Sequence, residues 1–442
     1  MQRPVRVQGV RSPASPALPL MARVSQKFPS PGECDVEREL HRQFADPDIV
    51  RRIPRGGKVA VAVGSRGISK IAEITGLVVR LLRDRGADPF IVPAMGSHGG
   101  ATAEGQKEVL ASLGITETRV GAPIVSSMDV VGLGHLADGS GVYWDRRAYK
   151  AGAAVVIGRV KPHTAFRGLI ESGLIKMAVI GVGKQRGAHA MHAPGFGRFA
   201  DRLLEGWGIV RARAPLLFGV AVVEDAYDAT VELAVVPPEA FLDREPPLLE
   251  RARSLMPRLP VQDIDVLIVQ EIGKNISGDG MDPNITGRYP TPFASGGPVI
   301  RKIVVLDLTA ETHGNANGIG LADFVPQRVL ERIDLAATYM NALTSTVTES
   351  IRLPAIMATD RDAVEAAVLA APVPADGHRR IVYVQNTLAL GDLAVSEAVL
   401  PDLGPGAVPS GPAKPLVFAE DGVLACPIPT AHPASRTPYG DF

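Results

Sequence analysis

Ionisable side chains are concentrated among short apolar runs between residues 155 and 192. Residues 153–157 have the uninterrupted apolar composition of a buried strand, and a Gly-Arg-Val-Lys-Pro-His turn follows them. Pro162 restricts the backbone just before His163, so this imidazole is presented from a stiff turn. The other ionisable side chains that follow are Arg167, Glu171, Lys176, Lys184, Arg186, His189 and His192. Such polar groups after a strand predict a binding or catalytic site in an α/β protein.

Two earlier loops have the same relation to strands. Residues 58–63 read as a strand that turns through Ser65, Arg66 and Gly67 into a helix whose apolar face spans residues 71–82. Residues 90–93 read as the next strand, and His98 follows it among glycines before a helix at residues 103–113. This alternation predicts a doubly wound, mainly parallel sheet. Right-handed crossovers then place Arg66, His98 and His163 at one carboxyl edge.

The residue types indicate possible roles at this edge. His98 and His163 have side chains that take or give a proton near neutral pH, although a loop histidine can also be merely solvated or cap a turn. The planar fork of Arg66 suits a carboxylate, or a surface ion pair. Ser65 and Gly67 lie where backbone N–H groups at a helix start can bind a phosphate.

Lys176, Lys184 and His192 are further candidates for a binding site. Lys176 lies in an apolar run, where a charged amine is costly unless it is paired or neutralised, or extends to the surface. Lys184 follows a Gly-Val-Gly turn and is a second candidate, suited to a phosphate. His192 lies in an expected helix, where a lone histidine is more often structural, but imidazole is also a common metal ligand.

The remaining chain predicts a second α/β domain and two irregular ends. We expect an N-terminal domain at 31–259, a smaller C-terminal domain at 260–400, and an active-site cleft between them. Residues 1–30 are expected to be disordered, or to lie partly upstream of a true start at Met21, and residues 401–442 to form a Pro/Gly-rich tail. Polar loops of the second domain hold Lys274, a candidate substrate-binding residue, and, without an assigned role, Asn275, Asp282, His313 and Asn315.

Composition excludes several classes of protein. The 47 basic and 47 acidic residues balance, so neither nucleic acid nor an anionic membrane is an expected partner. No apolar stretch is long enough to span a membrane. The 2 cysteines, Cys34 and Cys426, exclude a cysteine-rich metal site and a disulfide framework, and the chain is expected to be cytoplasmic. No Gly-x-Gly-x-x-Gly follows the first strand, which argues against a Rossmann dehydrogenase.

The run Pro162-His163-x-x-Phe166-x-Gly168, Gly173-x-x-Lys176 and His192 resembles the central motif of the nickel-dependent lactate racemase family. The resemblance implies His98 and His163 as acid/base groups, His192 as the nickel ligand and Arg66 as a substrate or cofactor contact. It implies a covalent bond from Lys176 to a nickel-pincer nucleotide that carries its own sulfur donors. The chain is longer than the family between Gly168 and Lys176, so Lys184 stays the alternative anchor.

The resemblance therefore implies a racemase or epimerase of a 2-hydroxy acid. Hydride would pass reversibly between the substrate carbon and the pyridinium ring of the cofactor, and cofactor-synthesis proteins would be partners. Two alternatives from other classes stay open. One is a non-catalytic nucleotide- or metal-binding protein. The other is a histidine-metal hydrolase or lyase, which the lack of a His-Glu-x-x-His motif disfavours.

Overall fold

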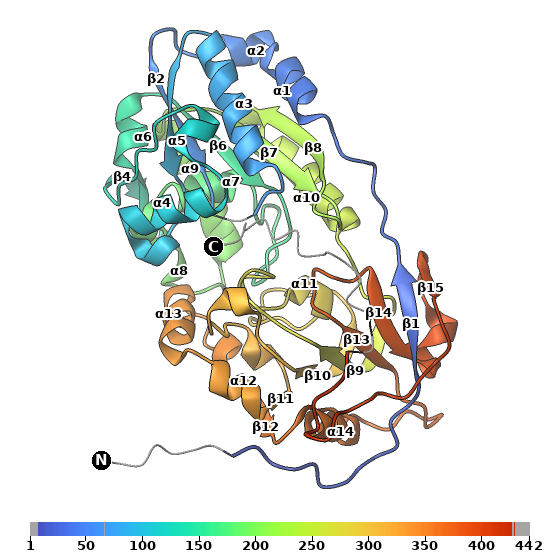
Figure 1. The fold of residues 1–442 in the computed structure, drawn as a ribbon. Coiled ribbons are helices and arrows are strands. Elements are labelled where there is room, and N and C mark those ends of the chain that lie inside the picture. The colour runs from blue at the N-terminus through green and yellow to red at the C-terminus, as the bar shows by residue number, and fades with distance from the viewer. Residues whose placement is uncertain (1–7, 66, 427, 429–442) are drawn as a thin grey trace, which may run out of the picture. The chain divides into compact units, whose positions relative to one another are not determined.

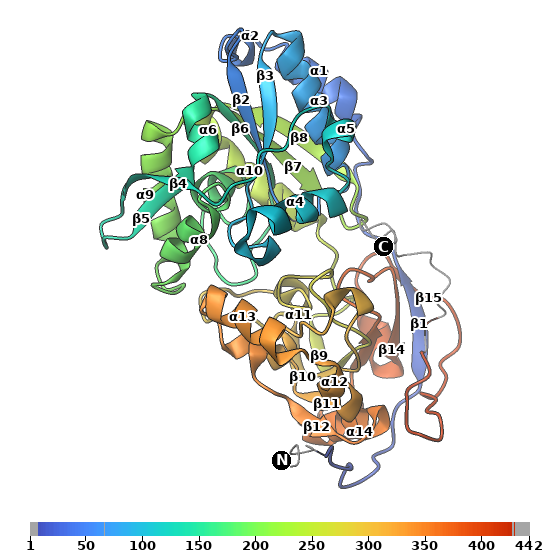
Figure 2. The same cartoon turned by 60° about the vertical axis from the view of Figure 1, so that its left-hand side comes forward.

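Runs of valine, isoleucine and alanine form the strands of two separate sheets, one in each of two units (Figures 1 and 2). The computed structural model describes residues 8–65, 67–426 and 428. Pro29–Met256 form what we call the N-terminal unit. The described residues before Pro29 and after Met256 form the C-terminal unit. In the described part of the chain, no helix is both long and apolar enough to span a membrane.

A five-stranded sheet is the centre of the N-terminal unit. Its strands are β2 (Lys58–Val63), β3 (Asp88–Pro93), β6 (Ala154–Arg159), β7 (Leu216–Glu224) and β8 (Thr230–Val236). The order is β3-β2-β6-β7-β8, with the first four parallel and β8 antiparallel to β7. The strands β2 and β3 are buried after their first residue, as expected where helices cover both faces of a parallel sheet. The predicted mainly parallel α/β sheet is thus confirmed.

The helices of the N-terminal unit pack around this sheet. They are α1 (Val36–Phe44), α2 (Pro47–Val50), α3 (Ile71–Asp84), α4 (Ala103–Ser112), α5 (Glu117–Val120), α6 (Arg146–Ala151), α7 (Leu174–Lys176), α8 (Lys184–His192), α9 (Phe199–Arg213) and α10 (Phe241–Leu255). A π-helical turn, Met177–Gly181, joins α7 to α8, and the hairpin β4 (Val130–His135) and β5 (Gly141–Asp145) completes the unit. The predicted apolar face of α3 is buried in a core shared with Val59, Val61 and Val63 of β2.

The parallel register brings three strand ends together. Val63, the last residue of β2, pairs with Pro93 of β3 and with Ile157 of β6. The loops that hold Ser65, His98 and His163 therefore leave neighbouring strands at the same edge of the sheet. The prediction that these loops share one edge is confirmed.

The C-terminal unit has an eight-stranded sheet in the order β12-β11-β10-β9-β13-β14-β1-β15. The strands are β1 (Met21–Gln26), β9 (Asp263–Val269), β10 (Val299–Val305), β11 (Phe324–Pro326), β12 (Ala355–Met357), β13 (Ile381–Val384), β14 (Asp392–Ser396) and β15 (Ala407–Pro409). The first five strands in this order, from β12 to β13, are parallel to one another. The remaining strands, β14, β1 and β15, each pair antiparallel with the strand before them in the order. Its α-helices are α11 (Pro283–Thr286), α12 (Gln327–Arg332), α13 (Leu335–Ser345) and α14 (Asp360–Ala370).

The prediction that residues 1–30 are disordered is wrong for β1. Met21 pairs with Ser396 and Ser25 with Val408, and the apolar side chains of β1 alternate into the core. The partners of β1 lie more than 350 residues later, so the local Pro- and Ser-rich composition does not reveal them. Within the expected tail, Ala407–Pro409 is a strand of the same sheet. Residues 1–7 and 429–442 lie outside the described residues.

Candidate functional site

His98 contacts Ser65 across two adjacent strand ends. The hydroxyl oxygen of Ser65, just after β2, lies 2.5 Å from Nδ1 of His98, just after β3. His98 is exposed, so its ring is accessible to a ligand. The backbone N–H of Gly96 donates to the carbonyl of Gly181 at 3.2 Å, which attaches this loop to the π turn. The structure therefore brings the first predicted histidine next to Ser65 and to the segment that follows Lys176.

Gln106, a residue that the sequence did not single out, fixes the His98 loop. Its side chain is fully buried, and its amide donates to the carbonyls of Gly96 at 2.9 Å and His98 at 3.3 Å. Gly99 has φ +64°, and a Cβ there would collide with the backbone of Gly105 at 2.5 Å. The loop thus depends on a close approach to the first turn of α4. A lone glutamine in a helix carries no local pattern that would predict this role.

Lys184 lies in the core, contrary to the expected polar turn. It begins α8 with φ +55°, and its side chain is fully buried. Its ammonium group lies 3.1 Å from the buried carboxylate of Asp145, and it also donates to Pro93 O and Gln106 Oε1. Burial lowers the pKa of Lys184, while Asp145 opposes that effect. This arrangement makes Lys184 a structural support of the His98 loop through Gln106 and argues against phosphate binding by its amine.

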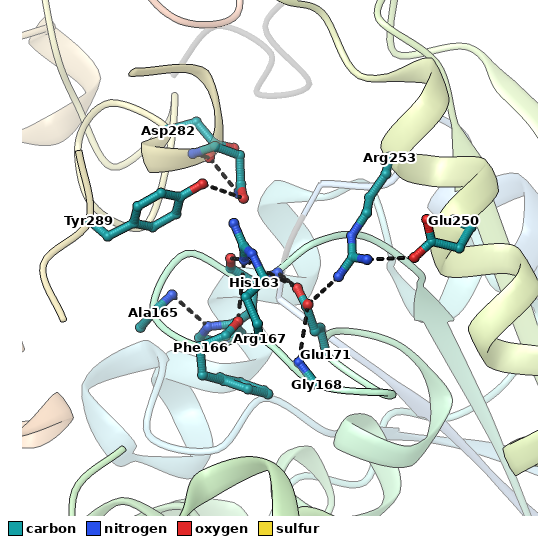
Figure 3. A network of polar contacts seen from close by, with 11 residues as sticks. His163, Ala165, Phe166, Arg167, Gly168, Glu171, Glu250, Arg253, Asp282 and Tyr289 are labelled. Atoms are coloured by element: carbon teal, nitrogen blue, oxygen red, sulfur yellow. Dashed lines mark hydrogen bonds and ion pairs between the residues drawn. The ribbon is translucent and has the colours of Figure 1, made fainter. Parts of the chain in front are cut away.

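A buried carboxylate organises the His163 loop (Figure 3). Glu171 is completely buried, and its Oε2 accepts the backbone N–H of His163 at 2.7 Å. Arg253 of α10 and Arg167 both pair with Glu171, and Arg253 also binds Glu250. The positive charges of two guanidinium groups compensate a buried carboxylate, which would be strongly unfavourable without a partner. Glu171 therefore holds the turn that presents His163.

His163 belongs to a cluster of rings. Its ring centroid lies 4.5 Å from that of Phe166, and Phe166 lies 4.8 Å from Phe199. The centroid of His192 lies 5.0 Å from Phe199 and 5.7 Å from Phe196. His163 is only 9% exposed. The structure thus links two predicted site residues, His163 and His192, through one aromatic cluster.

Lys176 ends α7 where the backbone changes to a π turn. Val182 N–H donates to Met177 O, and Gly183 N–H donates to Ile180 O. The carbonyl of Ala178, within this turn, accepts the indole N–H of Trp144 at 2.8 Å. Such π turns are rare in proteins and occur often at functional sites. Lys176 is half-buried rather than buried, which lets its amine leave the apolar run.

His192 has the proton arrangement of a metal ligand. Its Nδ1 lies 2.7 Å from the carbonyl of Ala188, and a carbonyl only accepts, so Nδ1 carries the proton and the lone pair lies on Nε2. Burial lowers the pKa of His192 to about 4, with a smaller contribution from the positive charge of Lys176. The imidazole is therefore neutral at pH 7, as a nickel ligand must be. His189, in the same helix, is exposed.

Glu245 is a further residue that the sequence did not single out. It lies in α10, fully buried, and its Oε2 accepts the N–H of Ile175 in α7 at 3.0 Å. A Cβ at Gly173 would lie 2.2 Å from Oε1, so only glycine leaves room for this carboxylate. Burial raises the pKa of Glu245 to about 7. Glu245 thus caps the short helix that ends at Lys176.

Two residues from neighbouring strands, Arg159 of β6 and Glu224 of β7, form hydrogen bonds with the loop after β2. Arg159 at the end of β6 donates to the carbonyl of Gly67 at 3.3 Å and pairs with Glu224 at 2.6 Å. Glu224 also accepts the N–H of Ser69 at 2.6 Å, and burial raises its pKa. Arg66 itself lies outside the described residues, so its predicted contact with a carboxylate or cofactor stays a prediction.

Lys274 lies in the C-terminal unit, in the loop after β9. Its ammonium group donates to Gly278 O and to Asn341 Oδ1, both at 2.8 Å. Further along this loop, Asp282 Oδ1 accepts the backbone N–H and the side-chain amide of Asn284, both at 2.9 Å. The hydroxyl of Tyr289 donates to Asn284 Oδ1 at 3.3 Å (Figure 3). The substrate contact of Lys274 stays a prediction.

Several observations fit the implied cofactor. Among the described residues, no group of three or more His, Cys, Asp or Glu side chains could hold a metal ion. His192 nevertheless has the tautomer and the low pKa of a single protein ligand, and Lys176 lies close enough to influence it. A nickel ion with one protein imidazole and donors from a bound nucleotide fits this donor set.

The chain is similar to known lactate racemases in sequence and in fold. Residues 26–198 match the family model described as the lactate racemase N-terminal domain. The lactate racemase apoprotein from Thermoanaerobacterium thermosaccharolyticum is 14% identical, with a TM-score of 0.51 over 87% of this chain and 94% of that one. A protein from Thermotoga maritima is also 14% identical, with a TM-score of 0.45 over 62% and 72%. No curated protein matches the chain. At this identity the first structure shows a shared fold.

Proposed function

The chain is a divergent member of the lactate racemase family through residues 26–198, and from this premise we propose that it is a racemase or epimerase of a 2-hydroxy acid. The proposal includes a nickel-pincer nucleotide as cofactor. His98 and His163 would serve as the acid/base groups, Lys176 as the covalent anchor and His192 as the nickel ligand.

One observation supports the proposal most strongly. It is the set of contacts that connects the candidate residues with the π turn Met177–Gly181 or with α8. Lys176 immediately precedes the turn, and the His98 loop is hydrogen-bonded to its last residue. The aromatic cluster connects His163 to His192, whose pKa responds to the charge of Lys176. Residues that are 94 positions apart in sequence, from His98 to His192, thus lie in one part of the N-terminal unit.

The protein would hold the cofactor by two bonds of different kinds. The amine of Lys176 would bind the nucleotide covalently, which removes the charge that its apolar surroundings disfavour. His192 would bind nickel through Nε2, because Ala188 holds the ring proton on Nδ1. When bound, the nucleotide supplies an acceptor for the hydride of the substrate carbon.

The remaining work of the side chains is proton transfer and positioning. An imidazole at His98 or His163 can take the hydroxyl proton and return it, and such a group typically contributes about 100- to 10,000-fold to the rate. Glu171, Gln106 and Glu245 hold the backbone around these groups, so that little reorganisation is needed during reaction. Arg66 and Lys274 would bind the substrate carboxylate.

The test uses protein produced together with the cofactor-synthesis proteins in medium that contains nickel. Single enantiomers of lactate and of larger 2-hydroxy acids are incubated with it, and chiral chromatography measures inversion. We expect inversion of at least one acid, and a loss of about 100-fold or more in His98→Ala. The control is His189→Ala, an exposed histidine of α8, which should retain activity.

Cofactor-loaded protein that inverts no 2-hydroxy acid would contradict the proposal and favour a binding protein. Hydrolysis or elimination that depends on a metal at the histidines would favour the hydrolase or lyase alternative instead.

A further inference from the structure

None of the predicted site residues lies in α10, yet this helix binds the segment between His163 and Lys176 at two points. Glu245 and Arg253 are about two turns apart in α10, so their side chains lie on the same face of the helix. Glu245 is buried against the start of α7, and Arg253 extends to the loop of His163 (Figure 3). One helix thus contacts the supports of two candidate groups.

At the first point, Arg253 holds the loop of His163 through Glu171. The loop is closed at its base, because the N–H of Lys161 donates to Ser172 O at 3.0 Å and the N–H of Ser172 donates back to Lys161 O at 3.2 Å. Glu171 lies just before this closure and accepts the N–H of His163 at 2.7 Å. Arg253 pairs with the other oxygen of the same carboxylate. The position of His163 therefore depends on a charged group of α10.

At the second point, Glu245 holds the helix that carries Lys176. Because α7 is only three residues long, it is too short to be stable without outside contacts. Glu245 Oε2 accepts the N–H of Ile175 at 3.0 Å, and Gly173 lacks the Cβ that would collide with Oε1. No ion pair to Glu245 occurs within the described residues, and such a buried carboxylate is costly. An apolar side chain would suit this place better if no function depended on the hydrogen bond.

From these contacts we propose that α10 is a brace with two positioning residues: Glu245 orients Lys176 for attachment of the cofactor, and Arg253 places His163 for proton transfer. The proposal rests on the proposed function. Each residue acts through a neighbour, Glu245 through the backbone of α7 and Arg253 through the carboxylate of Glu171. Loss of Glu245 should therefore lower attachment, whereas loss of Arg253 should lower turnover of protein that is already loaded.

The first test measures attachment in the full chain made together with the cofactor-synthesis proteins and nickel. Peptide mass mapping gives the fraction of Lys176 that carries the nucleotide. We expect this fraction to fall about tenfold or more in Glu245→Leu, and to stay near the wild-type value in Glu245→Gln, which keeps an oxygen for the N–H of Ile175. Where Glu245→Leu does not fold, Gly173→Ala, whose Cβ displaces the carboxylate, takes its place.

A control separates positioning from lost stability. Leu249→Ala removes a buried side chain one turn further along α10 and should keep the adduct, although it weakens the fold. A wild-type level of adduct in Glu245→Leu would overturn the role of Glu245. Equal loss of adduct in Glu245→Leu and Leu249→Ala would also overturn it, because any weakening of α10 would then have the same effect.

The second test concerns Arg253. Arg253→Met should carry nearly the wild-type amount of adduct, yet its turnover should fall about tenfold or more, because Glu171 loses one of its two guanidinium partners. Arg251→Met, an exposed arginine of the same helix, is the matched control and should keep both adduct and turnover. Wild-type turnover in Arg253→Met, or loss of adduct and turnover together, would overturn the role of Arg253.

Hydrogen exchange of the protein without cofactor distinguishes failure of this proposal from failure of the proposed function. The amide of Ile175 should exchange about tenfold or more faster in Glu245→Leu than in the wild type or Glu245→Gln, since its hydrogen bond is lost. Unchanged exchange would overturn the brace, whatever the activity. The expected exchange in a chain that never takes up the nucleotide would contradict the proposed function, and with it the role of Glu245 in attachment.

Discussion

Replacement of Glu245 by glutamine should change the pH dependence of folding stability. Glu245 is buried in α10, where one oxygen caps α7 and the other, Oε1, has no hydrogen-bond partner among the described residues. Burial raises its pKa from 4.5 to about 7. Glutamine has almost the same shape and keeps an oxygen for Ile175, but it cannot ionise. The substitution therefore isolates the cost of the buried charge.

The size of the effect follows from the pKa difference. Because the folded pKa lies above the unfolded one, the contribution of Glu245 to stability is fully present below pH 4.5 and is lost as the pH rises through 7. At about 1.4 kcal/mol per pH unit, the loss approaches about 3 kcal/mol above pH 7. In the variant, the amide group replaces Oε1 without an evident acceptor, which costs roughly 1 kcal/mol at every pH. Only the first quantity depends on pH.

Urea unfolding of the wild type and Glu245→Gln at several values between pH 4.5 and 8 measures this difference. We expect the free energy of unfolding of the wild type to fall relative to that of the variant by about 3 kcal/mol across this range. Glu250→Gln, an exposed position on the same helix, is the matched control and should change stability by less than about 1 kcal/mol. Parallel curves for the wild type and Glu245→Gln would show that the pKa of Glu245 is the same in the folded and unfolded protein, and would refute this reasoning.

Two further predictions concern a lysine and a histidine whose surroundings differ from those of their neighbours. Lys184→Met should destabilise the fold by about 3–5 kcal/mol, because it leaves the carboxylate of Asp145 buried and uncompensated. The control Lys150→Met, at an exposed position, should be nearly neutral in the same urea titration. A small effect of Lys184→Met would mean that the pair is not charged. His192→Ala should keep the covalent nucleotide yet lose nickel in elemental analysis, whereas His189→Ala should keep both. Nickel retained in His192→Ala would show that another residue binds it.

The sequence was sufficient for the parts of the fold that depend on local patterns. Continuous apolar runs identified β2 with the bounds that the structure has, and β6 within two residues. The rule of right-handed crossovers then placed the loops of His98 and His163 at one edge of the sheet. The periodic apolar residues of α3 likewise predicted its buried face.

The features that the sequence did not reveal depend on contacts between distant residues. Lys184 looked like a turn residue because glycines precede it, yet its partner Asp145 and the carbonyl of Pro93 come from other elements of the fold. Glu245 caps a helix that begins about 70 residues earlier. The strand β1 pairs with residues near the other end of the chain. Neither periodicity nor composition contains this information, because each contact forms only after the sheet is assembled.

The most direct measurement of the central claim is a peptide mass map of the protein made together with the cofactor-synthesis proteins and nickel. The proposed function predicts a covalent nucleotide adduct on the peptide that contains Lys176, and no adduct in Lys176→Ala. Such a bond survives denaturation, so the map identifies the anchor without any knowledge of the substrate. An adduct on Lys184 would contradict the anchor assignment, since that amine is buried against Asp145. An unmodified chain in every such preparation would contradict the proposal that this protein works with a nickel-pincer nucleotide.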